Sequence, residues 1–155
     1  MKERHHQKGE DVNPAIVPFD ISIYEEVIAL WMHCEGVGLG EGDSKQAIGA
    51  YLERNPGMSF VAKGNGKIVG AVLAGHDGRR GYLYHLAVDA GWRRQGIARQ
   101  LVEKCLDALK ASGIQKTHLF IFTNNTNGVA FWKSIGWTYR NDINVISKTI
   151  SSCHV

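Results

Sequence analysis

Long apolar runs are missing from this chain of 155 residues, and none approaches the roughly 20 apolar residues that a membrane-spanning helix needs. The polar start, residues 1–13, also lacks the apolar core of a secretion signal. Cysteine is scarce, and Cys34, Cys105 and Cys153 are an odd number at wide spacing. This argues against a disulfide framework and a zinc site. We therefore expect a cytoplasmic protein with no membrane partner and no metal.

The formal net charge of the chain is also small, at only +3. The basic residues form no long block, aromatic and basic residues do not alternate on one strand face, and no nucleic-acid-binding motif occurs. We therefore expect no nucleic-acid partner. The basic groups can instead serve a phosphate-rich small ligand.

The length fits one domain, which we expect over residues 14–155, with residues 1–13 forming a disordered tail. The periodicity of apolar residues predicts a mixed α/β fold with helices on both faces of the sheet. Strands are expected over Ala15–Phe19, Met58–Lys63, Lys67–Gly75, Tyr82–Val88, Lys116–Thr123, Trp137–Arg140 and Ile143–Ile150. Helices are expected from Asp20 or Ser22 to Cys34, from Asp43 or Ser44 to Arg54, over Ile97–Ser112 and over about Thr126–Ile135.

The most informative segment is Leu86–Arg99, which reads LAVDAGWRRQGIAR. It predicts a buried strand ending at Val88, a loop, and an amphipathic helix that begins near Gly96. The first N–H groups of a helix lack intrahelical partners and carry partial positive charge, so a pyrophosphate can accept their hydrogen bonds. Gly96 and the small Ala98 leave room for a phosphate near the backbone. Cationic donors around this site come from Arg93, Arg94 and Arg99.

Taken alone, this segment is also compatible with a basic surface loop that merely starts a helix. A P-loop is excluded because the chain contains no G-x-x-x-x-G-K-S/T. A Rossmann site is disfavoured because G-x-G-x-x-G is absent and the preceding strand is about the fourth in the chain rather than the first.

Two motifs in order resemble those of the GNAT acetyltransferases. Arg93–Ala98 (RRQGIA) matches the Q/R-x-x-G-x-G/A of that family's motif A, after a strand that ends L-A-V-D. Asn125–Trp137 (NTNGVAFWKSIGW) resembles N-x-x-A-x-x-F-Y-x-x-x-G-F, with Gly128 in place of the usual Ala and Trp132 in place of the usual Tyr. The hairpin Phe60–Gly75 resembles the family's second and third strands.

This resemblance covers about residues 14–150 and implies a GNAT fold, with a mixed sheet of six to seven strands whose fourth and fifth strands splay apart. It implies acetyl-CoA as cosubstrate, with the pantetheine arm in that gap and the Val88 N–H as the donor to the thioester oxygen. Residues expected to bind the cofactor are Leu86, Ala87, Val88, Arg93, Arg94, Gln95, Gly96, Ile97, Ala98, Arg99, Asn125 and Trp132.

The sequence shows no obvious general base. Family members often carry it on the fourth strand, on the face of Tyr82 and Tyr84, but a tyrosine titrates near pH 10. Tyr84 is therefore expected to shape the acceptor pocket or to relay protons. His85 is expected on the opposite face of an alternating strand, as a structural histidine. Glu35, in the glycine-rich loop beside the acceptor, is expected to bind the amine or take its proton, or else to be a solvated helix-end charge.

The resemblance therefore implies an N-acetyltransferase that moves an acetyl group from acetyl-CoA to a primary amine of a small molecule, peptide or protein by direct attack. A non-catalytic acyl-CoA-binding module of the same fold is the alternative, because Trp132 is unusual and the base is missing. The apolar segment Trp137–Ile150 is suited to pairing with a second copy of the chain, so the sequence leaves a homodimer open.

Overall fold

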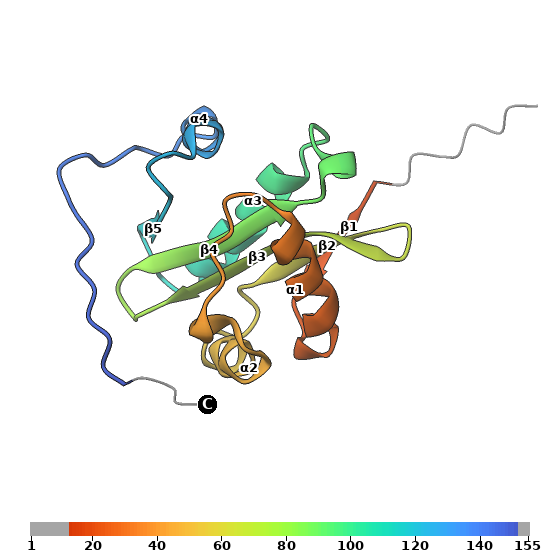
Figure 1. Cartoon of the computed structure of the whole chain (residues 1–155), viewed down its shortest axis with the longest axis horizontal. Helices are drawn as coiled ribbons and strands as arrows, with labels where there is room; N and C mark the ends of the chain where they lie inside the picture. The colour runs from red at the N-terminus through yellow and green to blue at the C-terminus, as the bar shows by residue number, and fades with distance from the viewer. Residues whose placement is uncertain (1–12, 152–155) are drawn as a thin grey trace, which may run out of the picture. The chain divides into compact units, whose positions relative to one another are not determined.

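The computed structural model describes residues 13–151, so the tail expected over residues 1–13 lies, except for its last residue, outside the described residues. The chain divides into two compact units, with the boundary between Phe120 and Ile121. The first unit holds a sheet of five strands in the order β1-β2-β3-β4-β5, in which only β4 and β5 are parallel (Figure 1). The strands are β1 (Ala15–Pro18), β2 (Phe60–Gly64), β3 (Lys67–His76), β4 (Gly81–Val88) and β5 (Thr117–Leu119).

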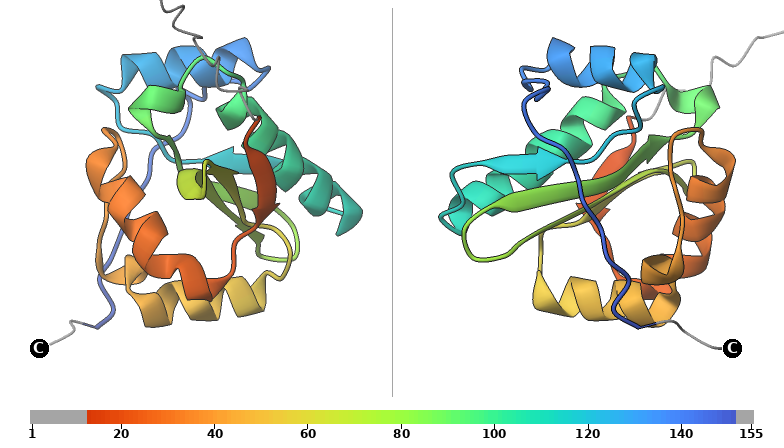
Figure 2. Two further views of the ribbon diagram at one scale, coloured as in Figure 1. Left: turned by 90° about the vertical axis from the view of Figure 1, so that its right-hand side faces the viewer. Right: turned by 60° about the vertical axis from the view of Figure 1, so that its left-hand side comes forward.

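Helices cover both faces of this sheet, as the sequence predicted. α1 (Tyr24–His33) and α2 (Lys45–Arg54) lie on one face, and α3 (Ile97–Ala111) lies on the other (Figure 2). Two consecutive residues of β3, Gly70 and Ala71, show which helices lie on which face. A Cβ on Gly70 would lie 3.1 Å from Leu101 of α3, whereas Ala71 packs in one apolar cluster with Trp31 of α1. Alternation along the strand thus sends successive residues to different layers.

Local sequence explains where these elements begin and turn. The Asp20 carboxylate accepts a hydrogen bond from the Ser22 N–H at 2.9 Å and starts a short 3-10 turn before α1. The Ser44 hydroxyl oxygen accepts one from the Ala47 N–H at 3.1 Å and caps α2. Asn65 and Gly66 join β2 to β3 with φ angles of 51° and 73°, the conformation of a two-residue hairpin turn.

In the described part of the second unit, residues 121–151, the one helix is α4 (Thr126–Ser134), close to its predicted bounds. The strands predicted over Trp137–Arg140 and Ile143–Ile150 are wrong, because these residues form no helix or strand (Figure 1). Apolar content favours a strand only where a neighbouring strand takes up the backbone hydrogen bonds, and none pairs here among the described residues. The described sheet therefore has five strands instead of six or seven, and the strand predicted over Lys116–Thr123 is shortened to β5.

Within residues 13–151, no helix combines the length and the apolar character that crossing a bilayer requires.

Gly75 of β3 provides a test of the packing between the sheet and α2. A Cβ at this position would lie 2.5 Å from the Tyr51 hydroxyl oxygen and 2.6 Å from Asn55 Cγ, and the Asn55 side chain is held by the His76 N–H. We expect Gly75→Ala to lower the free energy of unfolding by about 1–3 kcal/mol through overpacking. The measurement is urea denaturation.

The matched control is Gly49→Ala, within α2, where the nearest atom to the new Cβ is an ordinary contact at 3.6 Å. This variant should be as stable as the wild type or more stable, because alanine favours a helix interior over glycine. Equal stability of the Gly75→Ala variant and the wild type would contradict the packing described for Gly75.

Candidate functional site

The edge of β4 that faces β5 is paired along only part of its length. Parallel pairing joins Gly81 to Thr117, Tyr82 to His118 and Leu83 to Leu119, and stops there. β4 continues to Val88, and no described strand pairs with its residues 84–88 on that side. An open strand edge of this kind presents N–H and C=O groups that an extended ligand can pair with.

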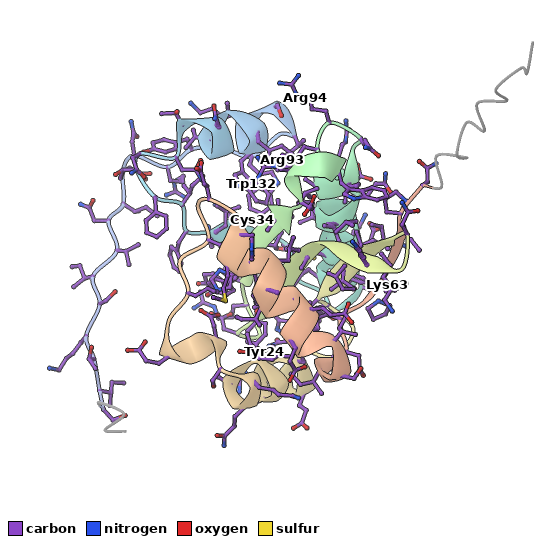
Figure 3. The ribbon with its side chains drawn as sticks, turned by 45° about the vertical axis from the view of Figure 1, so that its right-hand side comes forward. Tyr24, Cys34, Lys63, Arg93, Arg94 and Trp132 are labelled. Carbon is purple, nitrogen blue, oxygen red and sulfur yellow. The ribbon has the colours of Figure 1, made fainter. Side chains whose placement is uncertain are left out.

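The backbone groups of Leu86 and Val88 point toward this open edge. The Asp89 N–H donates to the Val69 carbonyl of the β3 side at 2.8 Å. Because successive residues of a strand direct their N–H and C=O groups to alternate sides, those of Val88, and of Leu86 two residues before it, point away from β3. The Val88 carbonyl accepts from Arg93 Nε at 3.3 Å and from the Cys34 thiol at 3.8 Å. Figure 3 shows Cys34 and Arg93 near each other at this end of the strand.

A β-bulge distorts β4 just before this edge. Ala71 pairs with Ala87 but Leu73 pairs with Tyr84, so one residue of β3 faces two of β4. His85 lies in the bulge with a φ of 55°, a left-handed conformation that non-glycine residues rarely adopt. As a result, Tyr84 and Ala87 pack against the same apolar cluster although they are three residues apart.

The expectation that His85 points to the face opposite Tyr84 is therefore wrong. Its Nε2 lies 2.7 Å from Asp43 Oδ1, and its ring lies 5.0 Å from the Trp31 ring, centroid to centroid. Both partners belong to the side of α1 and α2, which is also the side of Tyr84. Regular alternation fails because the bulge inserts an extra residue.

The loop after β4 ends at the N-terminus of α3, as predicted. Arg94 and Gly96 adopt left-handed conformations, with φ angles of 63° and 78°. Gly96 is the N-cap of α3, and no side chain caps the helix there. The nearest atom to a Cβ on Gly96 would be Gln100 Nε2, 3.9 Å away. The first turn of α3 is therefore an open, uncapped helix N-terminus, which suits an anion.

The sequence pattern of the Acetyltransferase (GNAT) family matches residues 24–137. The chain belongs to this family. It is accordingly an acyltransferase, and its relatives agree with that assignment. An acetyltransferase of Yersinia pestis (strain Pestoides F) is 32% identical over 120 residues, which cover 77% of this chain and 84% of the relative.

Solved structures show the same GNAT fold. Ard1 from Thermoplasma volcanium superposes with a TM-score of 0.72 at 20% identity, over 82% of this chain and 84% of its own. The aminoglycoside N-acetyltransferase AAC(6')-Iy, in complex with a bisubstrate analogue built on CoA, gives 0.72 at 18% identity, over 89% of this chain and 99% of its own.

The first unit of this GNAT protein brings most of the predicted site residues together at one end of β4. Leu86, Ala87 and Val88 lie at the bulged end of the strand, and Arg93–Arg99 form the loop and first turn that follow. Ile97 is buried, with 2% of its surface exposed, so only its backbone can face a ligand. Arg94 is exposed (Figure 3), and Arg99 Nε donates to Glu103 Oε1 at 3.1 Å along the exposed face of α3.

Two predicted residues belong to the second unit. The Asn125 side-chain oxygen accepts from the Gly128 N–H at 2.9 Å and caps α4. The Trp132 ring packs edge-on against those of Phe131 and Trp137, with centroids 5.3 and 4.7 Å away. Within its unit, Trp132 is thus part of an aromatic cluster.

The two side chains predicted for proton transfer differ in their surroundings. Tyr84 is half-buried, and burial, followed by the neighbouring Tyr82, raises the pKa of its hydroxyl. Tyr84 therefore stays protonated at neutral pH and cannot serve as the general base. Glu35 is exposed, and it forms no hydrogen bond or ion pair within residues 13–151.

Sequence reasoning missed two residues of this region, Asp43 and Cys34. Asp43 Oδ2 accepts from the Gly40 N–H at 2.9 Å, and the Asp43 main-chain carbonyl accepts from the Tyr24 hydroxyl at 2.6 Å. No local motif could have paired Asp43 with His85, because 42 positions separate them. Cys34 ends α1 beside Val88, a contact that likewise exists only in the folded chain.

The Cys34 thiol allows a test of this geometry. Burial raises its pKa, and the nearby Arg93 guanidinium opposes that rise only in part. Since the thiolate is the reactive form, Cys34 should be alkylated by iodoacetamide several-fold more slowly at pH 8 than a free thiol, with a rate that still rises above pH 9. Peptide mass spectrometry of a Cys153→Ser variant measures the rate.

Cys105 is the internal control, because it is fully buried and its pKa is raised to about 12. It should stay unlabelled until the protein unfolds. A Cys34 thiol that reacts as fast as free cysteine would contradict its position beside Val88.

Proposed function

We propose that this GNAT protein is an N-acetyltransferase that moves the acetyl group of acetyl-CoA to a primary amine by direct attack in a ternary complex. The observation that carries the proposal is the open edge of β4 at Leu86 and Val88, next to the uncapped N-terminus of α3. An extended chain with amide groups, such as pantetheine, can pair with the open edge of β4, while a pyrophosphate binds the N-terminus of α3. The CoA-derived ligand of AAC(6')-Iy supports the same cosubstrate here.

In this proposal the Val88 N–H donates to the thioester oxygen. The amine nitrogen attacks the carbonyl carbon, the C–N bond forms, and the C–S electron pair leaves with sulfur. Between these two events the carbonyl oxygen of the tetrahedral intermediate carries negative charge. A fixed N–H donor to such an oxygen accelerates the reaction about 10²–10³-fold in other enzymes. The Tyr84 hydroxyl, which stays protonated, is proposed to help shape the acceptor site and to pass a proton by way of water.

The phosphates are proposed to bind the backbone N–H groups of residues 94–98, with Arg93, Arg94, Gln95 and Arg99 at the rim. Ala98 and Ala87 contribute small side chains that leave room for the cofactor. Asn125 is proposed to reach the cofactor from α4 while it caps that helix. Trp132 is proposed as an apolar wall, because an indole does not ionise near neutral pH and cannot act as an acid. Glu35 is proposed to attract the ammonium group of the acceptor.

Three wider features belong to this proposal. The family match runs across the boundary after Phe120, which supports one domain over residues 14–155. The free thiols of Cys34 and Cys105 fit a reducing compartment such as the cytoplasm. Ile146 and Ile150 of the second unit are 95% and 97% exposed, which supports self-association of two copies.

A panel of amines tests the reaction. Wild-type protein is mixed with acetyl-CoA and small amines, aminoglycosides or peptides with free amino groups, and thiol release is followed with time. Transfer to an amine, identified by a mass increase of one acetyl group, would support an enzyme. Tight acetyl-CoA binding without transfer to any amine would favour the non-catalytic acyl-CoA-binding module, which the unusual Trp132 keeps in consideration.

Gly96 tests the cofactor site. We expect Gly96→Ala to raise the Kd for acetyl-CoA at least about tenfold, or roughly 1.4 kcal/mol, because its methyl group occupies space that phosphate oxygens need. Isothermal titration calorimetry measures the Kd.

Gly113→Ala at the other end of α3 is the matched control. Gly113 has a φ of 83°, against 78° for Gly96, and neither has an atom within 3.5 Å of the added Cβ, so the two variants share the same backbone strain. Only the Gly96 variant should bind acetyl-CoA more weakly. An equal change in Kd for the two variants would contradict the proposed phosphate site.

A further inference from the structure

We propose that His85, held by Asp43, is the general base that removes a proton from the amine acceptor. This inference rests on the proposed acetyl transfer and assigns the proton acceptor that the sequence did not reveal. It starts from the strained conformation of His85, because a left-handed non-glycine residue persists only where its surroundings hold it and is frequent at functional sites.

The imidazole is held in place by its neighbours but remains partly exposed to solvent. Its ring makes edge-on contacts with those of Trp31 and Tyr84, with centroids 5.0 and 6.5 Å away. The side chains of His85 and Asp43 retain 17% and 13% of their exposure. A small molecule or a water can therefore reach the pair, while the packing restricts rotation of the ring.

Asp43 determines which ring nitrogen can accept a proton. The 2.7 Å contact of its Oδ1 with His85 Nε2 requires a hydrogen on Nε2, since a carboxylate only accepts. Nδ1 then carries the free lone pair, and no described residue donates to it. A carboxylate holds the histidine of the Ser-His-Asp triad in one tautomer in the same way, with the two ring nitrogens exchanged.

Asp43 is itself anchored at both ends. Its Oδ2 accepts from the Gly40 N–H in the glycine-rich loop, and its main-chain carbonyl accepts from the Tyr24 hydroxyl of α1 (Tyr24 is labelled in Figure 3). The dyad therefore joins the bulge of β4 to the loop over residues 35–42. Such support is what keeps a proton acceptor in one position.

The position of His85 suits the reaction. The thioester, placed at the Val88 N–H, lies three residues farther along the same strand, or about 10 Å at 3.3 Å per residue, a span that the bulge shortens. α3 covers the other face of the sheet, so the amine approaches from the face of α1 and α2, where His85 lies. A single water spans only about 5–6 Å, so a short chain of two or three waters carries the proton over this distance.

The protons balance in this scheme. His85 Nδ1 takes one proton as the ammonium ion becomes the neutral amine, whose lone pair forms the C–N bond. The electron pair of the broken C–S bond stays on sulfur. The second proton of the attacking nitrogen passes to the thiolate, and the imidazolium later returns its proton to water.

A wild-type pH profile provides the first test. The titratable groups around the imidazole are Asp43 from the 3-10 turn Glu41–Asp43 and Tyr84 from β4, with Tyr24 of α1 bonded to Asp43 and Tyr51 of α2 beside Tyr84. Burial raises the pKa values of Tyr51 and Tyr84, so neither titrates near neutrality. We expect kcat/KM to fall at acid pH, because a protonated imidazole cannot accept a proton from the amine, and to level off at higher pH. A wild-type profile without this loss at acid pH would overturn the proposal.

Variants separate a base from a structural residue. His85→Gln keeps a donor to Asp43, and we expect it to lower kcat about a hundredfold, leave the Kd for acetyl-CoA within about twofold, and remove the loss of kcat/KM at acid pH. Asp43→Asn should lower kcat about tenfold. The matched control is His33→Gln at the exposed end of α1, where Nδ1 contacts only the Ala29 carbonyl of the same helix. This control should keep the wild-type profile.

The outcomes distinguish the two proposals. A wild type that binds acetyl-CoA but acetylates no amine overturns the proposed function and the base together. A wild type that transfers normally, with a folded His85→Gln variant whose kcat falls less than threefold or whose kcat/KM still falls at acid pH as in the wild type, overturns the base alone. If His85→Gln fails to fold, the wild-type profile and Asp43→Asn decide.

Discussion

The geometry of the site depends on the bulge in β4 at His85. A regular strand would continue the pairing with β3, send His85 toward α3 and leave Asp43 without its partner. The extra residue instead turns His85 and Ala87 toward α1 and α2, and β4 leaves the parallel register with β5 after Leu83. One local distortion thus accounts for the open edge that the proposed cofactor needs and for the position of the proposed base.

The left-handed backbone of His85 costs free energy, and the contacts around it offset that cost. Its ring packs against two aromatic rings, and its Nε2 meets a carboxylate that the Gly40 N–H also holds. Asp43 lies where the glycine-rich loop meets α2, so the side chain that orients the imidazole also anchors this loop to β4. Loops on a rigid scaffold are where relatives with one fold come to differ in what they bind.

Membership of the GNAT family explains the scaffold and the acyl-transfer chemistry, but not the acceptor. The solved structures similar to this chain share only about a fifth of its residues, which is enough to preserve the sheet and the helices around it. The proposed cofactor contacts are largely backbone groups of β4 and α3, and these tolerate many side chains. An acceptor is recognised by side chains, and those proposed to face it here come from the loop over residues 35–42 and the bulge.

By itself the sequence determined the elements whose cause is local. Ser44 caps α2, Asn65-Gly66 makes the hairpin turn, and the apolar period of residues 97–112 forms α3 with Gly96 at its start. The motif at residues 93–98 likewise located the loop that opens α3, the proposed phosphate site, because its spacing reflects a strand, a turn and a helix in sequence. Strands over residues 137–150 were predicted wrongly, since a strand needs a partner that no local pattern supplies. Only the tertiary structure decided the bulge at His85 and its pairing with Asp43, because register shifts arise from packing between strands and the two residues meet only when the sheet and the loop fold together.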